Sequence, residues 1–233
     1  MGPSRLSLAA LVAVLACSTV ACVDNESSLF IRGVMVLESG DCTASPDPGG
    51  TMQANGILDT SLTSTYIGAL LVGNQLVARG APAQLRTETA RIALRGAEVR
   101  VASTTQSVLK EFSVDGTGFV DPASGTSPGY GAFFATLIPN LDNIDRDTVI
   151  VNVRVFGRTL GGREVESGEL AYPIQLCSQC LISFPPEADN PSTPEYDCLM
   201  PAADDLEEPC FFGQDETVDC RLCTSSRTAC RAP

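Results

Sequence analysis

The chain of 233 residues contains no histidine and no tryptophan, and Lys110 is its single lysine. Without histidine, a serine or cysteine nucleophile has no imidazole base, which excludes a hydrolase of the Ser-His-Asp type. The absence of tryptophan, together with an aromatic content of only 6%, disfavours a carbohydrate-cleaving cleft. An enzyme built from this chain would have to rely on carboxylates or thiols.

Basic residues are also scarce, since 15 lysines and arginines face 28 aspartates and glutamates, giving a net charge of −13. Nucleic-acid binding requires a basic face toward the phosphates, so a nucleic-acid partner is not expected. Electrostatic adhesion to anionic lipid is disfavoured for the same reason. Attachment to a membrane would therefore need a covalently bound lipid.

The one long apolar run, residues 6–16, is short for a membrane span, which needs about 20 apolar residues. Arg5 precedes this run and small residues follow it. A charged start, an apolar core and small residues in that order predict a secretory signal peptide that is cleaved. The alternative is an uncleaved N-terminal membrane helix that extends to residue 23.

Two cysteines in the leader follow short apolar boxes: Thr19-Val20-Ala21 precedes Cys22, and Val14-Leu15-Ala16 precedes Cys17. This arrangement resembles the signal of bacterial lipoproteins. The resemblance implies cleavage just before the cysteine, diacylglycerol on its sulfur, and acyl chains such as palmitate. It also implies location in the cell envelope, at the outer membrane of a Gram-negative bacterium, with a secreted protein as the alternative.

The number of cysteines favours one of these two positions. If Cys22 is the lipidated residue, cleavage before it removes Cys17 with the signal peptide. Eight cysteines, an even number, then remain for disulfide pairing: Cys42, Cys177, Cys180, Cys198, Cys210, Cys220, Cys223 and Cys230. Lipidation of Cys17 would leave nine. Because exported chains normally pair their thiols, we expect lipid attachment at Cys22, with Cys17 as the alternative.

The sequence divides into a signal peptide (1–21), a polar tether after the anchor (22–28), a body (29–176) and an acidic cysteine-rich tail (177–233). The tail holds seven of the ten cysteines and few apolar residues, so it needs disulfides for its stability. Seven is odd, and Cys42 is the only cysteine of the body. We therefore predict a disulfide between Cys42 and the tail, with Cys177 or Cys180 as its partner.

The body shows the pattern of an all-β protein. Apolar or alternating runs separated by turn residues predict strands at 29–37, 66–72, 108–114, 131–138, 149–156 and 170–176. Pro173 places the last strand at a sheet edge or at a bulge, because proline lacks an N–H donor. This pattern resembles an antiparallel, immunoglobulin-like β-sandwich, without the Cys and Trp landmarks of true immunoglobulin domains. Residues 115–130 are expected to form a loop.

Residues 90–101 contain a shift in the alternation of apolar positions, which fall on even positions up to Leu94 and on odd positions from Ala97. Such a shift would turn the apolar face outward unless one extra residue absorbs it. Gly96 is the expected site of a β-bulge, or of a tight turn between two strands. A helix over residues 87–94 is the competing interpretation.

Several motifs have both a chemical and a structural interpretation. The C-x-x-C pairs at 177–180 and 220–223 match zinc or redox motifs, but an oxidising compartment favours disulfides, and no metal site is expected. The G-x-S-x-G match at 125–129 has Pro128 where an oxyanion donor is needed, so we expect a turn. The carboxylates at 142–147 lack the glycine and distal glutamate of an EF-hand, which favours a solvated turn over a calcium loop.

Two classes of function follow from these features. The first is a membrane-anchored, non-catalytic binding or structural module, with an extracellular or envelope protein or glycan as its partner and without catalytic residues or a cofactor. Loops such as 115–130 would form its contact surface. The second is a glycosidase-like hydrolase, which would require two carboxylates about 5–10 Å apart in a concave pocket.

Overall fold

A computed structural model of the chain describes residues 28–37, 40–79, 88–105, 107–140, 148–188, 192, 198, 206 and 208–222. The expected signal peptide, both candidate lipidated cysteines, the carboxylates at 142–147, Cys223 and Cys230 lie outside these residues. What the sequence predicts for them stays a prediction.

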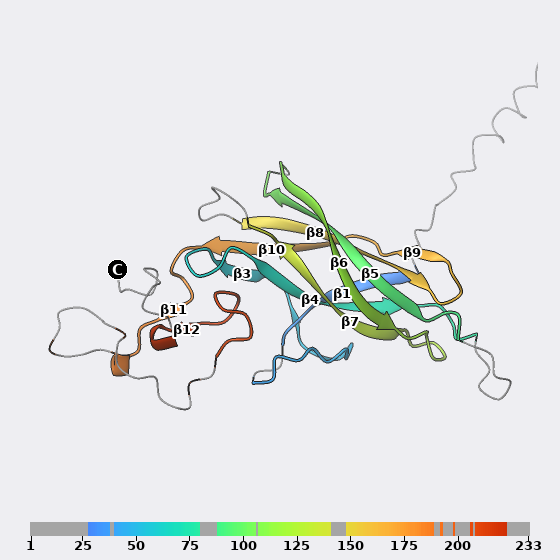
Figure 1. Ribbon diagram of the computed structural model, residues 1–233, viewed down its shortest axis with the longest axis horizontal. Helices are drawn as coiled ribbons and strands as arrows, with labels where there is room; N and C mark the ends of the chain where they lie inside the picture. The colour runs from blue at the N-terminus through green and yellow to red at the C-terminus, as the bar shows by residue number, and fades with distance from the viewer. Residues whose placement is uncertain are drawn as a thin grey trace, which may run out of the picture.

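Two antiparallel sheets form the body of the molecule (Figure 1). The first has the order β2-β1-β4-β7 and contains β1 (Leu29–Met35), β2 (Met52–Gln53), β4 (Tyr66–Asn74) and β7 (Gly129–Ile138). The second has the order β3-β10-β8-β5-β6 and contains β3 (Gly56–Asp59), β5 (Ile92–Ser103), β6 (Val108–Val120), β8 (Thr148–Thr159) and β10 (Leu170–Cys177), with β9 (Glu164–Glu166) paired to the end of β8. Only the β3–β10 pair of these two sheets is parallel.

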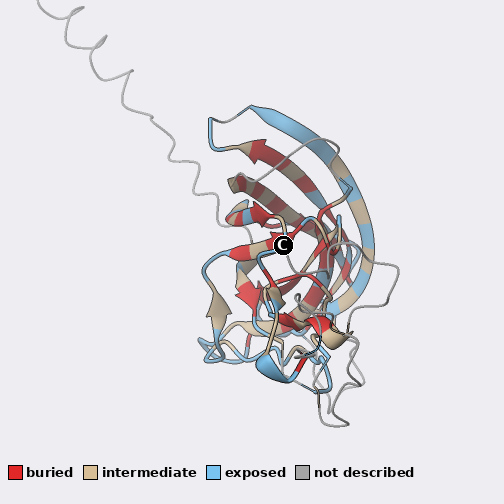
Figure 2. Cartoon of the chain, turned by 90° about the vertical axis from the view of Figure 1, so that its left-hand side faces the viewer, coloured by how far each residue is buried: buried red, intermediate tan, exposed pale blue. Residues whose placement is uncertain are grey.

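The core lies between the two sheets and takes alternate side chains from their strands. In β8, Val149, Val151, Val153 and Val155 are buried, and the residues between them are partly exposed. Burial of each such side chain contributes roughly 1.5–3 kcal/mol. Buried segments accordingly gather between the sheets in Figure 2, whereas the edge strand β6 is largely exposed.

The strand order confirms the predicted immunoglobulin-like sandwich. β4 lies beside β7 in one sheet, and β5, β8 and β10 follow one another in the other. These neighbours correspond to the B–E pair and the C–F–G set of immunoglobulin-like domains. The first strand of the chain pairs with β4, while β3 joins the opposite sheet next to β10.

The shift of alternation in residues 90–101 is a β-bulge, as the first of the three interpretations predicted. β5 is one continuous strand whose register with both neighbours shifts between Leu94 and Gly96. Arg95 is the extra residue relative to β8, and it is exposed, so Leu94 and Ala97 both point into the core. The helix over 87–94 is therefore wrong for its described residues, 88–94, none of which is helical, and no turn interrupts the strand.

Two other predictions need correction. Residues 115–130 are not one loop, because β6 continues to Val120 and β7 already begins at Gly129. β10 is not an edge strand, since it lies between β8 and β3. Pairing with β3 begins only at Ile174, so at Pro173 the strand has a ladder partner on the β8 side alone among the described residues. The missing N–H of Pro173 is tolerated at this position.

The described part of the tail packs against the body. Its short elements are β11 (Ile182–Ser183), β12 (Val218–Asp219) and the 3₁₀ helices η2 (Pro186–Ala188) and η3 (Cys220–Leu222). Within it, Arg221 donates to both oxygens of Asp219, at 3.0 and 2.7 Å, and this hydrogen bonding lowers the pKa of Asp219.

Residues 213–215 of the tail run along β3 and reach β4. The backbone N–H of Asp59 donates to the Gly213 carbonyl at 2.9 Å, and the N–H of Asp215 donates to the Ile57 carbonyl at 3.0 Å. The side-chain amide of Gln214 exchanges two hydrogen bonds with the backbone of Ile67. This segment therefore covers the edge of the sandwich that β3 would otherwise leave open.

Candidate functional site

The outer face of the second sheet carries a groove of about 500 Å³. Its polar lining comes from four elements, β5, β6, β8 and the segment before β10, and we call it the ionic groove: Glu98, Arg100, Glu111, Ser113, Asn152, Arg154 and Glu169. Asn152 and Arg154 alternate with the valines of residues 149–155, which indicates outward positions for both, but nothing in the sequence indicates the groove.

Strand register brings these side chains together. Arg100 of β5 lies opposite Glu111 of β6 and Asn152 of β8, and Glu98 lies opposite Arg154. Residues two apart in a strand share a face, so these pairs form adjacent rows across the sheet. The bulge at residues 94–96 sets this phase, because without the extra residue the charged positions of β5 would point into the core.

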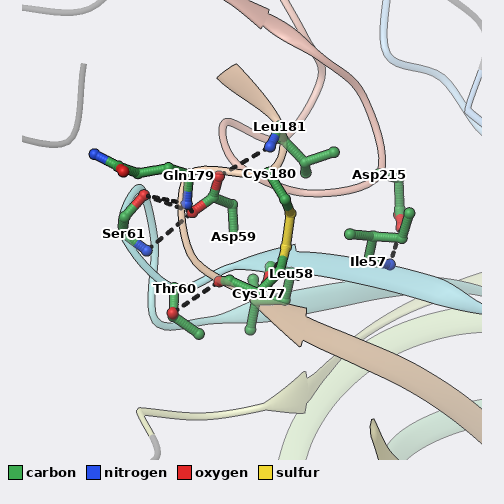
Figure 3. The surroundings of a disulfide bond; sticks show 10 residues. All are labelled: Ile57, Leu58, Asp59, Thr60, Ser61, Cys177, Gln179, Cys180, Leu181 and Asp215. Carbon is green, nitrogen blue, oxygen red and sulfur yellow. Dashed lines mark hydrogen bonds between the residues drawn. A yellow bond between two sulfur atoms is a disulfide. The ribbon is translucent and has the colours of Figure 1, made fainter. Parts of the chain in front are cut away.

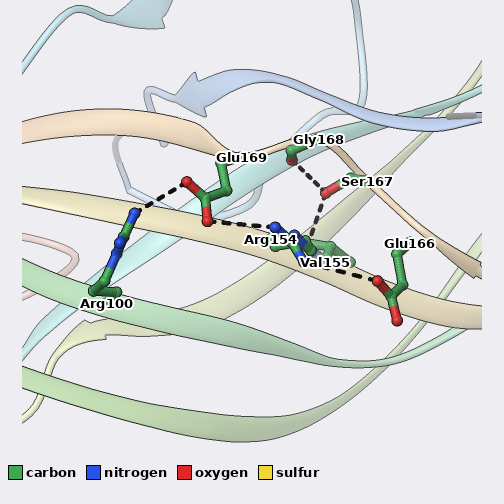
Figure 4. Close-up of polar contacts among 7 residues, drawn as sticks. All are labelled: Arg100, Arg154, Val155, Glu166, Ser167, Gly168 and Glu169. Carbon is green, nitrogen blue, oxygen red and sulfur yellow. Dashed lines mark hydrogen bonds and ion pairs between the residues drawn. The ribbon is translucent and has the colours of Figure 1, made fainter. Parts of the chain in front are cut away.

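Glu169 connects two arginines at one side of the groove (Figure 4). One of its carboxylate oxygens lies 3.2 Å from a terminal nitrogen of Arg100, and the other lies 3.4 Å from a terminal nitrogen of Arg154. Arg154 also reaches Glu166 at 3.9 Å. The arginines are thereby held in fixed directions over the sheet.

The turn that presents Glu169 is itself held by a buried serine. Ser167 is only 5% exposed; its hydroxyl accepts a hydrogen bond from the Val155 N–H at 2.9 Å and donates to the Gly168 carbonyl at 2.8 Å. The turn is thus attached to β8, on which Arg154 also lies. Because the turn and the arginine share this strand, their relative position is fixed.

These ion pairs contribute little to stability. The side chains of Arg100, Arg154 and Glu169 are between 38% and 43% exposed. Ion pairs with such exposure are worth about 0–1 kcal/mol because water screens them. The groove thus holds guanidinium, carboxylate and amide groups in an ordered arrangement that adds little to the stability of the fold. Such groups are suited to bind a polar or charged partner.

A second cluster surrounds the first C-x-x-C motif (Figure 3). Asp59 at the end of β3 is fully buried and accepts hydrogen bonds from the backbone N–H groups of Ser61, Gln179 and Leu181, at 2.9–3.0 Å. It also accepts one from the Ser61 hydroxyl. Cys177 and Cys180 lie beside this carboxylate and are joined by a disulfide.

This cluster is structural. Asp59, Cys177 and Cys180 have the residue types of a metal site and lie close together. Their ligand atoms are already used, because four donors surround the carboxylate and the two sulfurs are bonded to each other. The two C-x-x-C motifs do not share one site either, since Cys220 pairs with Cys198.

The described residues contain three disulfides: Cys42–Cys210, Cys177–Cys180 and Cys198–Cys220. The predicted link from Cys42 to the tail is present, but Cys177 and Cys180 are the wrong partners. They pair with each other because Asp59 gathers the N–H groups of Gln179 and Leu181 and thereby folds the loop between the two cysteines. This leaves Cys42 to the more distant Cys210.

The G-x-S-x-G match forms a turn, as its proline predicted. The Ser127 N–H donates to the Ser124 carbonyl at 3.1 Å, and Gly125 has a φ of 62°, which glycine adopts at little cost. The turn lies between β6 and β7. Nothing in its geometry arranges Ser127 as a nucleophile.

A buried polar chain joins the two sheets to the tail. The Tyr66 hydroxyl donates to Oδ2 of Asp215 at 2.8 Å and lies 3.1 Å from the Tyr172 hydroxyl, which contacts Gln53 at 3.3 Å. Burial, and then the charge of Asp215, raise the pKa of Tyr66 well above its usual value. Burial likewise raises the pKa of Tyr172 to about 12. This chain of contacts could not be predicted from the sequence, because its members lie far apart along the polypeptide.

Among the described residues, no helical segment has the length and apolar character that a membrane span requires. No protein-family model, curated protein or solved structure matches this sequence.

Proposed function

We propose that the protein is an exported lipoprotein that acts as a non-catalytic binding module at the cell envelope. Its mature chain would start at the lipidated Cys22, or alternatively at Cys17, and its sandwich would present the ionic groove to a polar or charged envelope protein or glycan. The groove is the observation that carries the binding part of this proposal.

The leader supports the anchor. A short apolar core, small residues and a cysteine follow one another in residues 6–22. The three disulfides of the described residues are consistent with an oxidising compartment outside the cytoplasm. The net charge of −13 leaves a covalent lipid as the means of membrane attachment.

The arrangement of the groove supports binding over catalysis. Each carboxylate oxygen of Glu169 lies within ion-pair distance of an arginine, so neither oxygen is left free to attack a substrate as a nucleophile. A paired-carboxylate hydrolase is the alternative, because Glu98 and Glu111 also line the groove. Loss of glycan turnover in both Glu98→Gln and Glu111→Gln variants would identify that alternative.

The anchor is tested by metabolic labelling with an alkyne analogue of palmitate. We expect the label on the wild-type protein and on Cys17→Ser, and its complete loss in Cys22→Ser. If the label is lost only in Cys17→Ser, the lipid is attached at the alternative position, Cys17. Absence of label from all three proteins contradicts a lipoprotein.

The binding face is tested by photocross-linking in intact cells. A benzoylphenylalanine at position 113, in the groove, should give one discrete cross-linked product, and one at position 47, on the exposed segment that follows β1, should not. The product should disappear when Arg100 and Arg154 are both changed to glutamate. A product that is insensitive to this charge reversal contradicts the groove as the binding site.

A further inference from the structure

A second, smaller pocket lies on the other side of the sandwich, between the outer face of the first sheet and the tail. Its volume is about 220 Å³, below the range of sites for drug-sized ligands, so it suits a single side chain or a comparably small molecule. The Cys42–Cys210 disulfide lies beside it, because Cys210 is part of its wall.

The pocket has an apolar floor and an acidic rim. Met35 of β1, Ala69 of β4 and Phe211 of the tail supply hydrocarbon and aromatic surface. Asp215 and Glu216 supply two carboxylates, and no basic residue is among the described residues that line the pocket. A ligand with a hydrocarbon body and a positive end matches this division, and an aromatic wall adds attraction for a cation.

The hydrogen bonds that Asp215 already accepts favour an ammonium group over a guanidinium group as its ligand. Its Oδ1 accepts the Ile57 N–H at 2.8 Å, and its Oδ2 accepts the Tyr66 hydroxyl and the Gln214 amide. A carboxylate offers about four acceptor positions, so about one is left. A compact ammonium group can use a single position, whereas a guanidinium fork prefers two parallel ones.

Asp215 is a partly buried carboxylate without a cationic partner among the described residues. The seven ion pairs found there all involve other carboxylates. Such a charge is stabilised when a cation approaches it in a partly desolvated site. Glu216 adds a second, exposed negative charge at the same rim.

We infer that this pocket binds a primary alkylammonium group, either the end of a lysine side chain or a free alkylamine. The inference is independent of the ionic groove and of the lipid anchor. It concerns a different face of the molecule and a different ligand chemistry.

The test is a titration of the purified mature chain with n-pentylamine, followed by NMR of the methionine methyl groups. We expect a saturable shift of the Met35 methyl. Pentanol, which lacks the charge, should bind about tenfold more weakly, and pentanoate should not bind. If pentanol and pentylamine bind equally well, the pocket binds only the hydrocarbon chain and not the charge, and the inference is overturned.

Two variants locate the site. Glu216→Gln, at an exposed position, should weaken pentylamine binding several-fold, whereas Ala69→Leu should block the pocket and abolish the shift. Glu164→Gln is the matched control, because Glu164 lies on β9 in the other sheet, and it should leave binding unchanged. A similar loss in Glu164→Gln and Glu216→Gln would indicate nonspecific attraction to an acidic protein and contradict the site.

A lysine derivative that is blocked at its α-amino and α-carboxyl groups, and keeps its side-chain ammonium group, identifies the source of the ligand. Binding as tight as that of pentylamine would identify a lysine side chain of a partner polypeptide. Binding more than about tenfold weaker would identify a free amine. If neither probe shifts Met35, the inference is wrong.

Discussion

Single residues carry the attachment between tail and body. Asp59 is a buried carboxylate in which every oxygen is occupied by a donor, and two of those donors belong to the loop after Cys177. A buried charge of this kind is tolerated because hydrogen bonds replace its lost hydration. Its position could not be predicted from the sequence, since nothing in Ile57-Leu58-Asp59 signals contacts with residues about 120 positions later.

Asp59→Asn should destabilise the protein by about 3 kcal/mol. The amide keeps one oxygen for the three donors at Oδ1, and its NH₂ group would face the Leu181 N–H, which would remain buried without a partner. The midpoint of urea unfolding measures the change. Asp47→Asn, at an exposed position, is the control and should stay within about 0.5 kcal/mol of the wild type; equal midpoints for both variants would contradict the role of Asp59.

Because the pKa values of Tyr66 and Tyr172 are raised, we expect the protein to lose stability at alkaline pH. Both pKa values are raised in the folded state, so their contribution is fully present below pH 10 and is lost as the pH rises toward 12. The free energy of unfolding should therefore fall above pH 10, reversibly on return to pH 8. In the double variant Tyr66→Phe/Tyr172→Phe this fall should be much smaller, although removal of the hydroxyl bonded to Asp215 costs about 1–3 kcal/mol at neutral pH.

Among the strands, the alternation of apolar and polar residues predicted the features that depend on neighbouring positions in the chain. The bulge of β5 was visible because burial on one face imposes a period of two, and a single extra residue breaks it. The short strand β3 was missed, since its four residues are too few to show a period. The groove was missed because it depends on strand order, which pairs β5 with β8 across about 50 residues.

Gly96 in the bulge should not tolerate a side chain. A Cβ there would lie 2.5 Å from the Val114 carbonyl oxygen and 2.6 Å from the Phe156 ring. Gly96→Ala should therefore destabilise the protein by about 1–3 kcal/mol through overpacking. Gly168→Ala is the matched control, because no atom lies within 4 Å of its Cβ position. Comparable unfolding temperatures for the two variants would contradict the close packing at the bulge.

At the scale of the whole molecule, the tail completes the sandwich. It covers the free edge of β3, supplies Asp215 to the buried tyrosines and is linked to the body by Cys42–Cys210. Counting cysteines predicted that such a link exists. Its partner was beyond prediction, because eight cysteines permit 105 pairings and only the folded tail brings Cys210 beside the first sheet.

Removing this link with Cys42→Ser/Cys210→Ser should cost about 2–5 kcal/mol, since the disulfide joins positions 168 residues apart. Replacing both cysteines avoids a free thiol that could exchange with other pairs. Unfolding in urea should report the loss, and the signal of the Met35 methyl should shift, because Met35 lines the same pocket as Cys210. Unchanged stability and an unchanged Met35 signal would mean that the tail docks without its covalent link.

The most direct test of the whole account is the intact mass of the protein extracted from native membranes, measured with and without reduction before alkylation. A lipid-anchored protein with four disulfides should begin at Cys22, carry acyl groups and gain eight alkyl groups only after reduction. A chain without acyl groups, or one that is alkylated before reduction, would contradict a lipid-anchored, fully disulfide-bonded module of the cell envelope.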